Sequence, residues 1–257
     1  MDPIMDLELW ITLCSVGFFA GLIDAIAGGG GMLTVPTLLT SGLPPHVALG
    51  TNKLAASFGS LTASITFYKK KLFDPSFWRL SIIFTAVGAI AGTLIVSHLS
   101  VEFLDKALPV LIIVTAVYTL FSKNIVGNEQ GLPQTTTKLK VTQSLQGIVL
   151  GFYDGVAGPG TGAFWTASSS ALYKINILLS CGLARSANFV SNFCSLLTFI
   201  YLGSVNALLG ISMGLFIMAG SWVGAHSAIK FGSRFIRPVF IVIVVLMSCN
   251  LAYQAWG

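Results

Sequence analysis

Four ionisable side chains lie inside segments of this sequence that are otherwise apolar: Asp24, Lys53, Asp154 and Arg185. A charge at the centre of a bilayer costs about 2.5–3.5 kcal/mol on insertion scales, so such residues are candidates for function. Two bases could attract an anion, while the acids could carry a proton or orient a base. The alternative is structural. Asp24 would pair with Lys53, and Asp154 with Arg185, as buried ion pairs that stabilise each half of the chain.

The two acids belong to two copies of one pattern. Gly17, Gly21, Asp24, Ala27, Gly28 and Gly30 recur at a constant offset (147 − 17 = 130), and Lys53 corresponds to Arg185 after a two-residue adjustment (185 − 53 = 132). Each half of the chain therefore supplies one acid on its first predicted helix and one base on its third. Duplicated and interrupted hydrophobic segments of this kind indicate the binding site of a transporter.

A glycine cluster follows each acid and predicts a break in the helix. Glycine suits such a break because it adopts positive φ and lets the backbone approach a ligand closely. The half-helix after a break presents unpaired N–H groups and a positive dipole end, which suit an anion. The candidate backbone ligands are Gly29, Gly30 and Gly31 in the first half and Gly160, Thr161 and Gly162 in the second. For Gly17 and Gly21 we expect close helix packing instead.

Amides and hydroxyls near the two bases could coordinate the oxygens of a substrate. Asn188 and Asn192 follow Arg185 at one-turn spacing, which places all three on one helical face. Thr51 and Asn52 precede Lys53 directly. The alternative for each of them is a hydrogen bond between helices, worth about 0.6 kcal/mol in membranes.

The elements that position these residues are helices of a membrane protein. The chain is 54% hydrophobic and 9% charged, against roughly 25% charged residues in soluble domains, and its mean hydropathy is +0.85. We predict an all-α integral membrane fold of two inverted-topology repeats, each with five helical elements that include a broken or re-entrant half-helix. The predicted elements are 7–27, 32–41, 48–68, 77–98 and 104–122, then 141–157, 162–172, 178–202, 206–227 and 236–256. The repeats are 1–122 and 141–257, with a cytoplasmic linker at 123–140.

The basic residues predict the orientation of the chain. If the N-terminus lies outside, eleven Lys and Arg residues fall in cytoplasmic loops and one, Lys106, falls in an outer loop, as the positive-inside rule requires. Five elements in each half is an odd number, so the second half enters from the opposite side. We therefore expect a multi-pass protein of the bacterial inner membrane with both termini outside.

Several function classes are disfavoured by the sequence. The four cysteines and three histidines are dispersed, without metal or redox spacing, and no nucleophile and base converge. The segment 155–162 is glycine-rich, but no Gly-Lys-Ser/Thr follows it. We expect no enzyme activity, cofactor, metal or nucleic-acid partner. The partners that we expect are a small-molecule anion and the lipid bilayer. Transport would then be secondary, or the protein would be a passive anion channel.

The motifs around these residues resemble a known family. The run from Ile23 to Gly31, then Val35-Pro36 and Gly50-Thr51-Asn52-Lys53, is similar to the first-repeat signature of the TauE/SafE sulfite exporter family. The run Tyr153-Asp154-Gly155, with Gly158 to Gly162, is similar to its second-repeat signature. The resemblance covers essentially the whole chain and implies an inner-membrane carrier of small anions, such as sulfite, thiosulfate or organosulfonates. Arg185 stands where this pattern leads us to expect Lys. An arginine favours bidentate recognition of carboxylate or sulfonate oxygens.

Overall fold

The structure is a computed structural model that describes residues 7–104, 106, 110 and 131–232. Within these residues it contains α1 (Leu7–Ala27), α2 (Gly31–Thr40), α3 (Pro45–Lys69), α4 (Arg79–Ser97), α6 (Thr137–Val156), α7 (Thr161–Tyr173), α8 (Ile177–Tyr201) and α9 (Ala207–Phe231). Eight predicted elements are confirmed as helices, with ends within four residues of the prediction. The predicted helix 236–256, nearly all of the predicted helix 104–122 and residues 123–130 of the predicted linker fall outside the described residues, and the last four linker residues belong to α6.

Capping residues explain where several helices begin. The side chains of Thr136, Asn176 and Asn206 accept hydrogen bonds from the backbone N–H three residues ahead, at 3.0–3.1 Å. Such caps satisfy N–H groups that a helix start leaves unpaired. Because Thr136 is a cap, α6 starts four residues before the apolar run from which its start was predicted.

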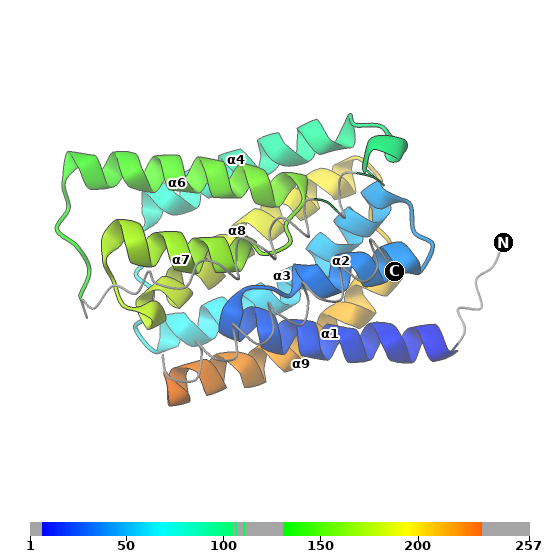
Figure 1. The fold of residues 1–257 in the computed structure, drawn as a ribbon, viewed down its shortest axis with the longest axis horizontal. Helices are drawn as coiled ribbons and strands as arrows, with labels where there is room; N and C mark the ends of the chain where they lie inside the picture. The colour runs from blue at the N-terminus through cyan, green and yellow to red at the C-terminus, as the bar shows by residue number, and fades with distance from the viewer. Residues whose placement is uncertain (1–6, 105, 107–109, 111–130, 233–257) are drawn as a thin grey trace.

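One glycine with positive φ follows the first helix of each half. Gly28, after α1, and Gly158, after α6, have φ values of +89° and +91°, which side chains other than glycine rarely adopt. In Figure 1, α1 and α6 enter from opposite ends of the molecule, and both end near its middle. The short helices α2 and α7 then run back from the two breaks. The predicted breaks are therefore confirmed.

The first helix of each half packs along the fourth helix of the other half. α1 lies against α9, and α6 lies against α4 (Figure 1). Glycines make the close approach possible: a side chain at Gly21 would overlap the backbone of Ile217, and one at Gly151 would overlap the backbone of Thr85. The expectation that Gly17 and Gly21 serve helix packing is confirmed. The two halves are interlocked crosswise.

The polar residues lie inside this bundle, and many apolar ones lie outside. On α6 an exposed stripe follows helical spacing, with Val141, Leu145, Ile148, Val149 and Phe152. By contrast, Lys53, Asp154 and Arg185 are at most 2% exposed. Within the described part of the chain, the helical segments Glu8–Ala27, Arg79–Ser97 and Ala207–Phe231 are long and apolar enough to cross a membrane. An apolar exterior around a polar centre is the arrangement that a bilayer favours.

Candidate functional site: a pocket between two helix breaks

The two glycine breaks meet at the centre of the molecule. Ala163 N, in the first turn of α7, donates a hydrogen bond to the carbonyl of Gly28 at 3.1 Å. A side chain at Gly28 would overlap the backbone of Gly162, and one at Gly31 would lie 3.2 Å from Pro159 Cα. Glycine at these positions is what lets the two chain breaks touch. Their convergence places residues of both halves around one pocket.

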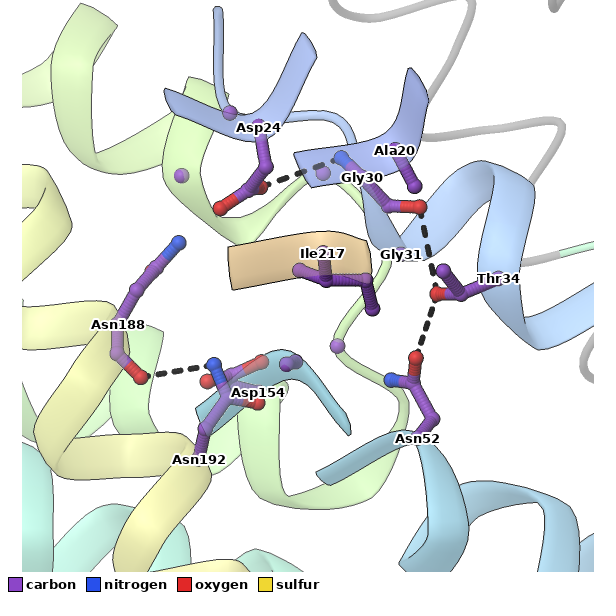
Figure 2. Close-up of a pocket in the computed structure, with 15 residues that line it drawn as sticks. Ala20, Asp24, Gly30, Gly31, Thr34, Asn52, Asp154, Asn188, Asn192 and Ile217 are labelled. Carbon is purple, nitrogen blue, oxygen red and sulfur yellow. Dashed lines mark hydrogen bonds between the residues drawn. The ribbon is translucent and has the colours of Figure 1, made fainter. Parts of the chain in front are cut away.

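This pocket is small, and in Figure 2 the apolar side chain of Ile217 lies between the polar side chains that line it. Its central space leaves about 30 Å³ for water-sized molecules, which suits a small ion rather than a drug-sized ligand, whose site takes ~300–1,000 Å³. The wall contains Asp24, Thr34, Asn52, Asp154, Asn188 and Asn192, backbone of Gly28, Gly30, Gly31, Gly158, Gly160 and Gly162, and apolar atoms of Ala20, Ala56 and Ile217.

Amide and hydroxyl groups line the pocket from α2, α3 and α8. The Thr34 hydroxyl lies within hydrogen-bond distance of Asn52 Oδ1 and of Gly30 O. Asn192 Nδ2 donates to the carbonyl of Asn188 at 2.8 Å. Among the described residues, Asn188 Oδ1 is buried without a hydrogen-bond partner. The pocket therefore offers an unsatisfied polar atom to a ligand or to water.

The four charges form two ion pairs, and both pairs connect one half of the chain with the other. Lys53 Nζ lies 2.9 Å from Asp154 Oδ1, and Arg185 Nη1 lies 3.7 Å from Asp24 Oδ2. Pairing within each half, Asp24 with Lys53 and Asp154 with Arg185, is therefore wrong. The physical reason is the crosswise packing, which brings the third helix of each half to the break in the other half.

Each base also binds the backbone at the opposite break. Lys53 Nζ donates to the carbonyl oxygen of Asp154, and Arg185 Nη1 donates to the carbonyl oxygen of Asp24. Both carbonyls lie near the end of a helix, where the helix dipole attracts cations; the carbonyl of Asp24 also accepts from Gly28 N at 2.9 Å. Each base thus holds an acid by its side chain and by its backbone.

The surroundings of the two acids differ. The Asp154 carboxylate accepts hydrogen bonds from Lys53, Thr161 and Ser191, and its side chain is 3% exposed. The Asp24 carboxylate accepts a hydrogen bond from Gly30 N at 3.2 Å, and its side chain is 22% exposed. Figure 2 shows this carboxylate directed into the pocket.

Most of the predicted site residues meet at this pocket, although some lie behind it. Nine of the fourteen line it: Asp24, Gly30, Gly31, Asn52, Asp154, Gly160, Gly162, Asn188 and Asn192. Of the other five, Lys53, Arg185 and Thr161 bind the two acids from outside the wall. Thr51 Oγ1 accepts from Asn206 N at 2.9 Å, away from the pocket, and a side chain at Gly29 would meet Ile23.

Thr34 and Ser191 were not predicted from the sequence. Thr34 is one of three threonines in an otherwise apolar half-helix, and nothing in the sequence distinguishes it from the other two. Ser191 could have been found, because it follows Asn188 by three residues and so shares its helical face. It is buried, and its hydroxyl binds Asp154.

With both acids ionised and both bases protonated, the four charges sum to zero. The wall adds amide, hydroxyl and backbone groups, which can bind the oxygens of a small ion without adding charge. Over the residues that the structure describes, no group of three His, Cys, Asp or Glu side chains is placed to hold a metal ion. The site is suited to reversible binding of a small polar species.

Comparisons with known proteins find membrane transporters that are similar along almost the whole chain. The family model described as sulfite exporter TauE/SafE matches residues 13–251. A Haemophilus influenzae protein named "Probable membrane transporter protein" is 36% identical over 259 residues, covering 97% of each chain. The Escherichia coli K12 protein "Probable membrane transporter protein YfcA" is 34% identical over 252 residues, covering 96% of this chain and 90% of its own. No solved structure matches significantly.

Proposed function

The chain belongs to the sulfite exporter TauE/SafE family of membrane transporters, and from this premise we propose that it is a secondary transporter of a small anion. The class of anion is that of sulfite, thiosulfate or an organosulfonate. The observation that carries this proposal is the pocket itself. Both helix breaks form its wall, two ion pairs lie in or directly behind this wall, and its size suits a small ion.

The anion's oxygens bind the amides of Asn52, Asn188 and Asn192 and backbone N–H groups at the starts of α2 and α7. These helix starts follow Gly30 and Gly160, and their positive dipole ends favour negative charge. Arg185, directly behind the wall, supplies the attracting charge. Lys53 holds Asp154 and so fixes the second break.

The two halves act as inverted repeats around this site. The directions of the helices support this arrangement: in Figure 1, α1 and α3 run right to left, whereas their counterparts α6 and α8 run left to right. A pocket on the axis between inverted repeats can open alternately to either side. Lys69 ends α3, and Lys70 and Lys71 come directly after it, at the end of the molecule where α6 starts (Figure 1). The positive-inside rule supports a cytoplasmic location for this end, with the N-terminus outside an inner membrane.

The test is flux into proteoliposomes that contain the purified protein. Labelled sulfite, thiosulfate and methanesulfonate are offered separately, with and without gradients of protons or sodium. A carrier accumulates one of them against its concentration gradient when a coupling gradient is present. Flux that only ever runs down the anion gradient, with single-channel conductance, would identify a passive anion channel instead.

The site is tested with Asn188→Ala and Arg185→Gln. Both should reduce anion flux about tenfold or more, since the loss of a hydrogen bond to a charged group is worth ~1.5–3 kcal/mol. Ser212→Ala is the matched control, because Ser212 is exposed on α9 and its hydroxyl bonds Leu208 O. Full flux in a folded Arg185→Gln, Asn188→Ala double variant would remove these residues from the site.

A further inference from the structure

We infer that the two equivalent acids have different roles: Asp24 is the group that exchanges a proton during transport, and the Lys53–Asp154 pair is fixed. This inference rests on the proposed function and names the coupling residue of the same pocket. It predicts that the anion and one proton cross together. Four observations carry it: the hydrogen bonds of the two acids, their exposure, the sequence at their donors' positions, and the charge of the cluster.

Both oxygens of the Asp154 carboxylate already accept hydrogen bonds from side chains, and three donors hold the group in place. Lys53 and Thr161 bind Oδ1, at 2.9 and 3.1 Å, and Ser191 binds Oδ2. These donors come from α3, α7 and α8, so three elements hold the carboxylate. Removing Lys53 alone would leave this charge buried without its partner, which is strongly unfavourable.

The Asp24 carboxylate accepts fewer hydrogen bonds than the Asp154 carboxylate. Its separation from Arg185, 3.7 Å, is that of an ion pair without a direct hydrogen bond. Oδ1 accepts from Gly30 N, whereas Oδ2 has no hydrogen bond among those of the described residues. At 22% exposure the side chain can be reached from the pocket. A proton can therefore bind Oδ2 without displacing a donor.

The sequence accounts for this difference. At the repeat offsets, Thr161 corresponds to Gly31 (161 − 130 = 31), and Ser191 corresponds to Gly59 (191 − 132 = 59). The two hydroxyls that bind Asp154 are thus replaced, around Asp24, by glycines that have no side-chain donor. Asp24 keeps the counterpart of Lys53, Arg185, and loses the other two donors.

The charged neighbours of Asp24 can be followed through each element that packs near it. Arg185 of α8 pairs with it, Asp154 of α6 lies across the pocket, and Lys53 of α3 is held by Asp154. Helix α2 has no ionisable side chain, and the phenol of Tyr173, at the far end of α7, bonds Gln146 Oε1. Helix α9 contributes His226 and Lys230, which are exposed. Cys181, a thiol on α8, is buried one turn before Arg185.

The total charge of the four ionisable side chains links the binding of a proton to the binding of an anion. With both acids ionised, a bound anion would leave a buried negative charge uncompensated, which is unfavourable. When an O–H bond forms on Asp24, Arg185 loses its counter-charge, and the cluster becomes positive by one. The anion takes the place of the neutralised carboxylate as the partner of Arg185. A monoanion therefore crosses electroneutrally with one proton, and a dianion carries one net negative charge.

The experiment measures anion accumulation in proteoliposomes under a proton gradient, with sulfite, thiosulfate and methanesulfonate offered separately. One coupled proton and a gradient of about one pH unit support roughly tenfold accumulation in the wild type. Asp24→Asn should lose this accumulation and still exchange internal for external anion, because it resembles the protonated state. Membrane potential should drive thiosulfate but leave methanesulfonate unaffected in the wild type.

The matched control is the Lys53→Met, Asp154→Asn double variant, which removes the fixed pair without leaving a lone charge. The ratio of its accumulation with and without the proton gradient should equal that of the wild type, whatever its absolute rate. Gradient-driven accumulation in Asp24→Asn, or its loss in the double variant with Asp24 intact, would overturn the inference.

A second measurement needs no transport. Infrared difference spectra between neutral and acidic pH contain the carbonyl stretch of every carboxyl group that gains a proton. One component of this signal, the Asp24 band, should be present in the wild type and in the double variant and absent from Asp24→Asn. If the wild type moves none of the three anions, the proposed function fails, and the infrared band still decides whether Asp24 exchanges a proton. If anions move but the band persists in Asp24→Asn, the inference alone fails.

Discussion

The crosswise pairing of buried charges leads to a prediction about stability. Lys53 and Asp154 come from different halves of the chain and are 1% and 2% exposed. Lys53→Met leaves the Asp154 carboxylate without its cation, and Asp154→Asn leaves the Lys53 ammonium without its anion. Breaking a buried pair by removing one partner costs about 3–5 kcal/mol, whereas removing both charges is often close to neutral.

The double-mutant cycle should therefore give a large coupling energy between positions 53 and 154. Each single variant removes the 2.9 Å ion pair, but only the double variant relieves the orphaned charge. With single variants that cost about 3–5 kcal/mol each and a double variant close to neutral, the coupling reaches about 6–10 kcal/mol, so we expect at least the ~3 kcal/mol at the upper end for residues in contact. The Lys53→Met, Asp24→Asn cycle is the control. Its coupling should be smaller, because no contact between these residues occurs among the described side chains.

The assay is equilibrium unfolding of the purified protein in mixed detergent micelles, followed by circular dichroism. Each variant is compared with the wild type at one pH and one detergent composition. A coupling between Lys53 and Asp24 that equals or exceeds that between Lys53 and Asp154 would refute the crosswise assignment. It would restore pairing within each half.

Three further predictions concern the backbone, the buried network and the orientation. Gly28→Ala should destabilise the fold by more than Gly42→Ala. Both have positive φ, with a strain of about 1–3 kcal/mol, but only at Gly28 would the new methyl group overlap another segment; the same unfolding assay compares them. Tyr173→Phe should cost about 1–3 kcal/mol in that assay, because it leaves a glutamine oxygen without its 2.6 Å donor; a loss below half of that would show that water replaces the phenol. In a cysteine-free background, Lys70→Cys should react with an impermeant thiol reagent from the cytoplasmic side and Glu102→Cys from the outside; the reverse pattern would invert the proposed topology.

The helices were predictable because long apolar runs and glycine clusters mark the helices and their breaks in the sequence of a membrane protein. Apolar runs set the lengths, and the clusters at Gly28 and Gly158 set the breaks. The shift at the start of α6 has a physical cause: its first turn, beginning at Thr137, is polar, and the cap at Thr136 is a local hydrogen bond that apolar runs do not reveal. Crosswise packing was not predictable from the repeat. The repeat shows that Asp24 and Asp154 are equivalent, and this equivalence holds whether each pairs within its half or across.

The site, too, was predictable where it depends on local sequence and unpredictable where it depends on helix packing. Gly30 was predicted because it belongs to the glycine cluster at a break. Asn188 was predicted because it is an amide one turn after Arg185 in an apolar helix. Thr51 was expected at the site for its position beside Lys53, but its hydroxyl accepts the backbone N–H of Asn206 and caps another element. The packing of α3 against α8 and α9 determines which face of α3 lines the pocket. The local spacing of residues contains no information about this packing.

The backbone bonds of the two bases explain how the pocket can change its charge without losing its shape. Arg185 is bound both to the Asp24 side chain and to the Asp24 carbonyl oxygen. A carbonyl oxygen does not titrate, so protonation of the carboxylate weakens one of these contacts and leaves the other. Arg185 then remains at the break, where its charge can meet an anion, instead of moving away with the loss of its partner. Since the base and the break belong to different halves, we expect this contact to couple the proposed protonation of Asp24 in one half to the position of the other half.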